Sequence, residues 1–285
     1  MGVDFLQETE MVASGFQKID FDFMIKKLSV KILAAIILLF CYCSSSYSQG
    51  NVLSEGEELV YVVSYGFIKL GEVKISLSGK KYIEGKEIYF SKATMKTYSG
   101  IPFVSLNSVF ESEMIYENNR VYSRRFKAVE YKEDGILKIE YAFNYDSNFV
   151  HVIVTKDGRT DRDEKIKINQ NVKFQDGLSL FYCARLDSYS EENFMIPVFM
   201  NEAETSVKYY FNSQKEETSA SIFDDDIKTI RCNGNASFKG VFGLTGEFAG
   251  WFSDDEARIP IKSQMNVMIG SVTLELESYK RKNWH

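Results

Sequence analysis

Apolar and polar residues alternate along most of the chain from Leu59 onward, and this period of two constrains the possible fold more than any other feature. Such alternation places apolar side chains on one face of a β-strand and polar side chains on the other. The alternating segments are separated by pairs that favour turns, namely Glu84-Gly85, Asn118-Asn119, Asp134-Gly135 and Asp157-Gly158. Strands joined by tight turns predict an antiparallel sheet.

One segment, DGLSLFYCARLDSY, departs from this alternation. Asp176 stands where it can cap a helix N-terminus. The residues that follow at helical spacing are Leu178, Phe181, Tyr182, Arg185 and Leu186. We therefore predict one helix, from Asp176 to about Tyr189.

A long antiparallel sheet must curl or split, because strand twist accumulates and exposed edges invite aggregation. We therefore expect a mainly β fold, either a strongly curved antiparallel sheet or an open or closed β-barrel-like domain. The central helix should cover one opening. A closed barrel of the lipocalin type is the nearest alternative.

The stretch from Met24 to Ser48 has the three-part pattern of a secretory signal peptide. Lysines precede an apolar run from Ile32 to Cys43, which is short for a permanent membrane span, and small polar residues follow. We predict cleavage after Ser48 and export to the periplasm. Residues 1–23 are interpreted as an upstream extension, 24–48 as the signal peptide and 49–285 as a single β-rich domain.

Two cysteines at the end of the apolar run raise the alternative of a lipid anchor. A lipid-attachment cysteine needs a small residue before it, but Cys41 follows Phe40 and Cys43 follows Tyr42. Simple cleavage and release is therefore favoured over lipidation or outer-membrane association. Two more cysteines, Cys183 and Cys232, could pair in an oxidising compartment or remain as buried thiols.

Composition argues against a nucleic-acid partner. The formal net charge is −6, and phosphate binding requires clustered Lys and Arg. No apolar run after residue 48 approaches membrane-spanning length.

Catalytic patterns are weak throughout the sequence. His151 is the only interior histidine besides the terminal His285, and no G-x-S-x-G motif is present. Carboxylates cluster at Asp224-Asp225-Asp226, at Asp254-Asp255-Glu256, and along Asp157, Asp161, Asp163 and Glu164. Turns favour Asp for its bonds to nearby backbone, so we interpret all three clusters as solvated hairpin tips rather than glycosidase or calcium sites. We predict no catalytic residue, no cofactor and no metal site.

The stretch WFSDDEARIP, from Trp251 to Pro260, is interpreted as a hairpin. GEFAGWFS alternates before it and IPIKSQMNV alternates after it, with Pro260 at a strand start. Arg258 could pair with Asp254 or Asp255 across the turn as an exposed contact.

Three groups of residues together resemble a known family. The first group runs from Gly56-Glu57 through Leu59, Tyr61 and Tyr65-Gly66 to Ile68 and Leu70-Gly71-Glu72. The second comprises Asp176, Leu178-Ser179, Tyr182 and Arg185; the third comprises Trp251, Ser253, Asp254 or Asp255, Arg258, Pro260 and Gly270-Ser271-Val272. Their order and spacing are similar to the bacterial domain-of-unknown-function family 3108. The resemblance implies an exported, β-rich protein of Gram-negative bacteria with no assigned activity, and it supplies no catalytic residue. It suggests that the helix and the Trp251–Pro260 hairpin are paired structural features, with Arg185 or Arg258 binding a carboxylate that fixes helix to sheet.

A binding or carrier function is the leading hypothesis. Aromatic side chains of a curved sheet could line a concave pocket for a lipid or another amphiphile. The candidate lining residues are Tyr61, Phe67, Tyr89, Phe90, Tyr141, Phe143 and Tyr145. The alternatives are a structural or assembly partner for an envelope protein and, third, a carboxylate-dependent glycan hydrolase.

Overall fold

Fourteen strands and one helix account for the regular structure of the part of the chain that the computed structural model describes, residues 51–101, 105–238, 246–266, 270–282 and 284. All of these residues belong to one compact unit, Ser48–His285. The predicted signal peptide and upstream extension lie outside the described residues. Among the residues described, no helix combines the length and the apolar character needed to span a membrane.

The strands follow one another along the chain with short connections, and the helix α2, Gly177–Asp187, interrupts them between β8 and β9. The strands are β1 (Glu57–Tyr65), β2 (Ile68–Ile83), β3 (Lys86–Thr97), β4 (Asn107–Glu117), β5 (Arg120–Lys132), β6 (Gly135–Asn144), β7 (Phe149–Lys156), β8 (Arg159–Lys167), β9 (Asn193–Met200), β10 (Ala203–Thr218), β11 (Ile227–Ala236), β12 (Gly246–Ser253), β13 (Pro260–Asn266) and β14 (Ser271–Lys280).

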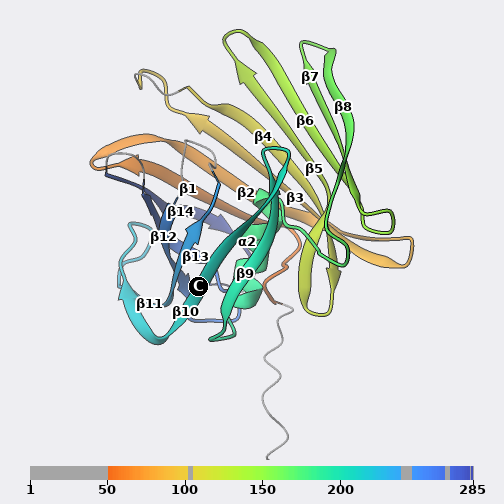
Figure 1. Cartoon of the computed structure of the whole chain (residues 1–285). Helices are drawn as coiled ribbons and strands as arrows, with labels where there is room; N and C mark the ends of the chain where they lie inside the picture. Colours follow the sequence, from red (N-terminus) through yellow and green to blue (C-terminus); the bar gives the residue numbers. More distant parts are fainter. Residues whose placement is uncertain (1–50, 102–104, 239–245, 267–269, 283, 285) are drawn as a thin grey trace, which may run out of the picture. The chain divides into compact units, whose positions relative to one another are not determined.

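All fourteen strands form one sheet in the order β8-β7-β6-β5-β4-β3-β2-β1-β14-β13-β12-β11-β10-β9. Neighbouring strands are antiparallel, and β1 pairs with β14, which joins the first half of the chain to the second. The two edge strands are β8 and β9. The sheet curves around α2 without closing into a barrel (Figure 1).

A short extended segment before α2 connects two parts of the sheet. The Ser123 backbone N–H on β5 donates to the Phe174 carbonyl at 2.9 Å. Gln175 makes a parallel bridge with Val198 on β9, and its N–H donates to the Pro197 carbonyl at 2.9 Å. The segment thus satisfies backbone groups of edge strand β9 and holds the start of α2 close to β5.

The main core lies on the face of the sheet that surrounds α2. Alternate residues of the strands pack with Leu178, Tyr182 and Leu186 of the helix in one buried cluster. Aromatic rings contact one another within it: Tyr141 lies 5.6 Å from Phe126 and 5.2 Å from Phe199 between ring centroids. This part of the aromatic sheet is therefore a packed core.

The structure confirms the mainly β fold, the strongly curved antiparallel sheet and the central helix. The closed-barrel alternative is wrong for the described residues, because β8 and β9 remain edges. The predicted turn at Asp157-Gly158 is present, but Asp161, Asp163 and Glu164 lie on strand β8 rather than at a hairpin tip. A solvent-exposed edge strand accepts polar residues at every position, so it lacks the alternation that revealed the other strands.

Candidate functional site

The N-terminus of α2 is held by a buried carboxylate. Asp176 caps the helix, accepting at one oxygen from the N–H groups of Leu178 and Ser179 at 2.8 and 2.9 Å. Its second oxygen accepts from the hydroxyls of Ser112 on β4 and Ser123 on β5, each at 2.6 Å. Burial raises the pKa of Asp176, and the four donated hydrogen bonds act in the opposite direction. Asp176 therefore fixes the helix to two strands as well as capping it.

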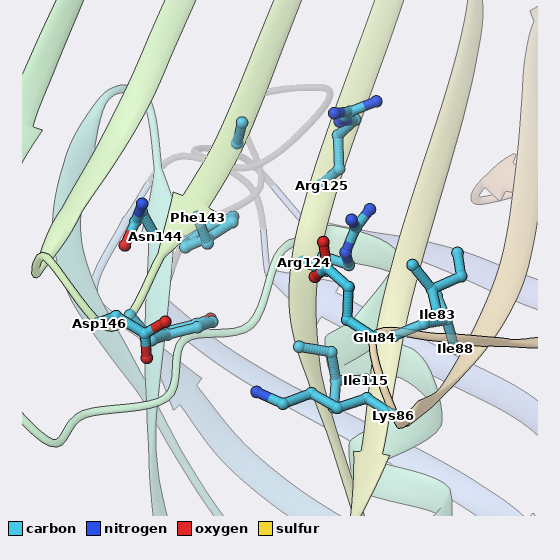
Figure 2. Close-up of a pocket in the computed structure, with 12 residues that line it drawn as sticks. Ile83, Glu84, Lys86, Ile88, Ile115, Arg124, Arg125, Phe143, Asn144 and Asp146 are labelled. Carbon is cyan, nitrogen blue, oxygen red and sulfur yellow. The ribbon is translucent and has the colours of Figure 1, made fainter.

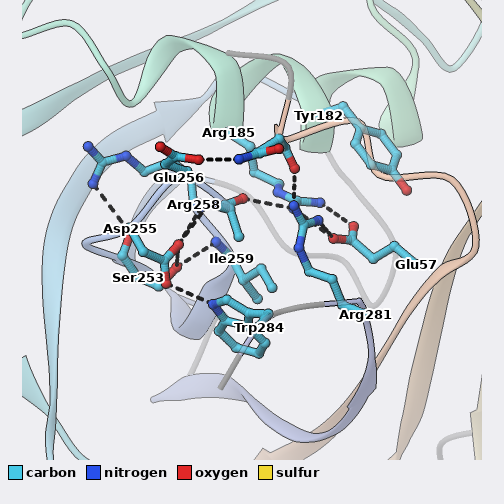
Figure 3. A network of polar contacts seen from close by, with 12 residues as sticks. Glu57, Tyr182, Arg185, Ser253, Asp255, Glu256, Arg258, Ile259, Arg281 and Trp284 are labelled. Atoms are coloured by element: carbon cyan, nitrogen blue, oxygen red, sulfur yellow. Dashed lines mark hydrogen bonds and ion pairs between the residues drawn. The ribbon is translucent and has the colours of Figure 1, made fainter. Parts of the chain in front are cut away.

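A second buried contact holds the middle of the helix to strand β1. The Arg185 guanidinium donates to both oxygens of Glu57, at 2.6 and 3.0 Å, and to the Ala257 carbonyl at 2.9 Å. Arg281 also donates to Glu57. Figure 3 shows Arg185 reaching from α2 toward Glu57, with Arg281 rising from below toward the same carboxylate. Arg185 is completely buried and Glu57 almost so, which makes this a bidentate pair shielded from water.

The hairpin between β12 and β13 completes this network. Asp255 accepts at one oxygen from the Ser253 hydroxyl and the N–H groups of Ala257 and Arg258, and at the other from the Trp284 indole at 2.7 Å. The hairpin also accepts a bond from Tyr189, just after α2, at its Glu256 carbonyl. Figure 3 shows these contacts directly below the helix. The expected pairing of helix and hairpin is therefore present, and Arg185 makes the carboxylate contact that we predicted.

The environment of Arg258 differs from our expectation. Arg258 does pair with Asp254, at 3.1 Å, but its side chain is buried rather than exposed. Its guanidinium lies 4.7 Å from the centroid of the Tyr189 ring. The Tyr189 ring, just after α2, helps to shield the Arg258 side chain from water. The sequence of a charged turn does not indicate this burial.

The other residues of the predicted motifs lie at several different positions in the fold. Pro260 begins β13, and Ser179 closes a capping box with Asp176. The Tyr182 hydroxyl lies 3.3 Å from the hydroxyl oxygen of Ser91. Trp251 instead donates to Glu216 at 3.0 Å and carries Arg231 over its ring, so it is not part of the Arg185 network.

The two cysteines do not form the disulfide that we considered. Cys183 and Cys232 are both free and buried. Burial raises the pKa of each thiol, which keeps it protonated and unreactive. The Cys183 sulfur lies near Asp187, a buried carboxylate that also accepts from Tyr209 at 2.8 Å.

The seven predicted lining aromatics do not form one surface. Phe67 is fully exposed at the β1–β2 turn, apart from the buried aromatic residues. Tyr61, Tyr89 and Tyr141 are buried in the main core. Phe90 packs in a small second cluster with Ile88, Ile115 and Tyr122. Only Phe143 and Tyr145 line a pocket that the structure describes.

This pocket lies where the β2–β3 turn approaches β5 and the end of β6, and its volume is about 220 Å³. One wall is apolar and includes Ile83, Ile88 and Ile115. Figure 2 shows these isoleucines on one side, Asp146 and Asn144 on the opposite side, and Arg124 and Arg125 above. The lining contains the basic residues Lys86, Arg124 and Arg125 and the acidic residues Glu84 and Asp146. The pocket thus combines an aliphatic wall with a mainly basic rim.

A β-bulge explains why two consecutive arginines reach the same pocket. Arg125 pairs with Glu113 and Ser123 pairs with Met114, so Arg124 is an extra residue on β5. Consecutive residues of a regular strand point to opposite faces, and a bulge changes this direction. Arg124 binds Glu113, whereas Arg125 lies 3.8 Å from the same carboxylate and is nearly half exposed. Arg125 is therefore the more available cation.

A lysine lies over the aromatic end of the pocket. The Lys173 ammonium is 4.1 Å from the centroid of the Tyr145 ring and 4.9 Å from that of Tyr122. Burial and the nearby charge of Lys86 lower the pKa of Lys173. The positive charge around the pocket therefore extends beyond the lining residues.

The remaining polar candidates lie away from this pocket and from the α2 network. His151 contacts Asp163 of edge strand β8 at 2.7 Å. Asp224, Asp225 and Asp226 lie in the β10–β11 connection. Within the described ranges, no three His, Cys, Asp or Glu side chains come close enough to share a metal ion.

Comparison with known proteins identifies the family. A profile of the protein family of unknown function DUF3108 matches residues 60–277. The chain belongs to this family. No curated protein matches it.

Three solved structures that are similar to this DUF3108 protein have very low sequence identity to it. A β-barrel-like protein of the domain of unknown function DUF1849 from Brucella abortus is 8% identical, with a TM-score of 0.54 over 81% of this chain and 100% of the other. A candidate exported protein with a YmcC-like fold from Bacteroides fragilis is 8% identical over 80% of this chain and 96% of the other, with a TM-score of 0.33. A candidate lipoprotein from Parabacteroides distasonis has the same identity and coverage and a TM-score of 0.26. The first likeness supports the fold alone.

Several contact residues escaped the sequence analysis. Glu57 belongs to the first quoted motif, but its role as the Arg185 partner was not predicted, and Arg281, Ser112 and Ser123 were not singled out. An acidic residue at an inward position of an otherwise apolar strand, as in EELVYVV, was the available signal for Glu57. The arginine pair at the pocket was also missed, because a bulge in β5 changes the direction that alternation would assign to Arg124.

Proposed function

We propose that this DUF3108 protein is an exported, non-catalytic binding protein whose ligand is a small anionic amphiphile. The observation that carries the proposal is the pocket near Arg124 and Arg125. Its isoleucine wall suits an apolar tail, and its basic rim suits an acidic head group. The predicted signal peptide supports a periplasmic location.

Arg125 is the residue best placed to bind the head group. Arg124 is already paired with Glu113, and Figure 2 shows Glu84 directed toward it. Arg125 has only the longer 3.8 Å contact with Glu113 and remains partly exposed to solvent. A guanidinium in this position can bind a carboxylate or phosphate through two parallel hydrogen bonds.

The size of the pocket restricts the ligand. Pockets for typical small molecules have volumes of roughly 300–1,000 Å³, and this one has about 220 Å³. We expect either a short-chain amphiphile or the head-group end of a longer one.

The buried carboxylates favour binding over catalysis. Asp176 accepts four hydrogen bonds from the protein, and Glu57 is shared by two arginines. Both side chains are buried and engaged in holding α2. A general acid or base must reach the reacting atom of a substrate, so these groups are unsuited to that role.

Titration calorimetry of residues 49–285 with decanoate tests the proposal, with decanol as the uncharged comparison. We expect decanoate to bind more tightly, and Arg125→Gln to weaken it by about 10-fold, since a charge-assisted hydrogen bond contributes about 1.5–3 kcal/mol. Arg162→Gln on edge strand β8 is the matched control and should bind as the wild type does. Equal binding by the Arg125→Gln variant would contradict the proposal.

A second candidate function is that of an assembly partner for an envelope protein. Met195 on edge strand β9 and Tyr210 on β10 are exposed large apolar side chains on adjacent strands. Native mass spectrometry of protein purified gently from its own periplasm separates the two functions. A small co-purifying mass supports the carrier, whereas a stably bound protein together with an empty pocket supports the partner.

A further inference from the structure

The sheet has two edge strands, and the structure covers only one of them. At edge strand β9, Gln175 donates its N–H to the Pro197 carbonyl and accepts from the Phe199 N–H, each at 2.9 Å. Pro197 has no N–H of its own to offer. At the other edge, every residue of β8 except Ile166 is exposed, and no strand of the described chain pairs with its outer side (Figure 1). Strand β8 is therefore the edge that is open to another strand.

The hydrogen-bond register shows which backbone groups of β8 face this open side. The Ile168 N–H donates to the Asn148 carbonyl, just before β7. In an antiparallel pair, the residues that bond the same neighbouring strand alternate. Ile166 and Glu164 therefore bond β7 in the same register. The N–H and C=O groups that point outward are those of Asp163, Lys165 and Lys167.

Acidic and basic side chains occupy opposite halves of this edge. The sequence from Asp161 to Lys167 is DRDEKIK, with acids at 161 and 163 and lysines at 165 and 167. Within the ranges that the structure describes, neither lysine forms an ion pair, and Lys165 lies over the Phe149 ring. Asp163 pairs there only with the His151 imidazole and is more than half exposed. One molecule thus leaves both halves without a basic or acidic partner of full charge.

We propose that β8 pairs with β8 of a second copy of this chain, antiparallel, about a two-fold axis at Glu164. In this register Asp163 of each copy lies opposite Lys165 of the other. Their outward backbone groups can then exchange hydrogen bonds across the interface. A two-fold axis makes both copies use the same surface, so each opposite-charge pair occurs twice.

The charge pattern favours this occupant and this register. Opposite charges directly across a ladder favour pairing, and like charges oppose it. An axis one residue away would place Lys165 opposite Lys165, or Asp163 opposite Asp163. Glu164 meets its own copy on the proposed axis, but Arg162 of the same strand contacts and neutralises each carboxylate. The charges that discourage other strands therefore fit a second copy of β8.

Analytical ultracentrifugation of residues 49–285 tests the pairing. We expect the wild type to dimerise, and Lys165→Glu to raise the Kd of the dimer at least ~10-fold, since a carboxylate then faces Asp163 at two places in the interface. The double variant Asp163→Lys, Lys165→Glu exchanges the charges and should dimerise as the wild type does. This recovery distinguishes lost pairing from misfolding.

Two further variants are controls. Lys138→Glu reverses an exposed lysine of β6, a strand with neighbours on both sides, and should dimerise as the wild type does. Arg125→Gln should also leave the dimer unchanged, because no residue that lines the pocket lies on β8.

A second measurement reports the register. Side chains that meet on the axis come close enough to crosslink, so Glu164→Cys should form a disulfide between two copies under mild oxidation. Lys167→Cys, toward the end of the strand, should not. The natural Cys183 and Cys232 are buried and do not compete. A wild type that remains monomeric across the concentration series would overturn the proposal. So would a dimer that Lys165→Glu does not weaken, or crosslinking at Lys167→Cys instead of Glu164→Cys.

Discussion

The two ends of the same sheet are built differently. At the end where β1 turns into β2, the apolar side chains of Phe67 and Ile68 are exposed to solvent. At the opposite end, the connections are rich in Asp, Glu and Asn, and the β12–β13 hairpin is bonded to α2. Polar residues at this second end bond the backbone of the turns and fix the helix, whereas the side chains of Phe67 and Ile68 at the first end are exposed to solvent. The difference separates side chains that stabilise the fold from side chains that are exposed to solvent.

The largest effect is expected when the Arg185–Glu57 contact is broken. Replacing Glu57 with Ala leaves Arg185 buried without its counter-charge and also removes the partner of Arg281. We expect a loss of about 3–5 kcal/mol in the free energy of unfolding. Denaturant titration measures it, and Arg185→Ala should cost less, because Arg281 still neutralises Glu57.

Asp176 should follow, with an effect that depends on the substitution. Asp176→Ala removes the helix cap and the acceptor of two buried hydroxyls, for an expected loss of about 2–4 kcal/mol. Asp176→Asn retains a capping oxygen and should lose about 1 kcal/mol. Equal losses in the two variants would show that the cap contributes little to stability, and that the bonds to Ser112 and Ser123 account for the loss.

The pH dependence of unfolding, compared between the wild type and Asp176→Asn, checks the direction in which the pKa of Asp176 is shifted. Burial raises its pKa in the folded protein, so the native state takes up a proton at a higher pH than the unfolded chain does. As the pH falls through the folded pKa toward the ordinary carboxyl value, the wild type should therefore gain stability relative to Asp176→Asn. A difference that moves the other way would mean that the four hydrogen bonds outweigh burial.

A smaller loss is expected from Asp255→Ala. This carboxylate accepts from the β12–β13 turn and from Trp284. Its removal leaves buried donors unpaired, at a cost of about 1–3 kcal/mol. Thermal unfolding measures the loss, and Asp225→Ala in the β10–β11 connection is a control that should unfold like the wild type.

The smallest effect on stability is expected for a substitution at the β1–β2 turn. Phe67→Ser removes no buried contact, so the free energy of unfolding should change by less than about 0.5 kcal/mol. A large destabilisation would show that Phe67 packs against the protein in solution. The contrast between a stabilising end and a solvent-exposed end of the sheet would then be wrong for Phe67.

The alternating sequence by itself determined the strands, the turns at Asn118-Asn119 and Asp157-Gly158, and the capped helix beginning after Asp176. These features depend on local periodicity and on a side chain bonding its own backbone, both of which are visible in neighbouring residues. The paired motifs of helix and hairpin were also predicted. The first half of strand β8, with Asp161 and Asp163, was interpreted as a hairpin tip, because its exposed residues carry no alternating face.

Only the tertiary structure decided what the long-range contacts would be. Glu57 and Arg185 lie 128 residues apart in sequence, and Arg124 reaches the pocket through a bulge that depends on pairing with β4. Tyr141 becomes part of the core because it packs against Phe126 and Phe199 of other strands, whereas Phe67 remains in solvent at the β1–β2 turn. Alternation assigns a side chain to a face, but only the packing of distant strands and α2 determines what that face contacts.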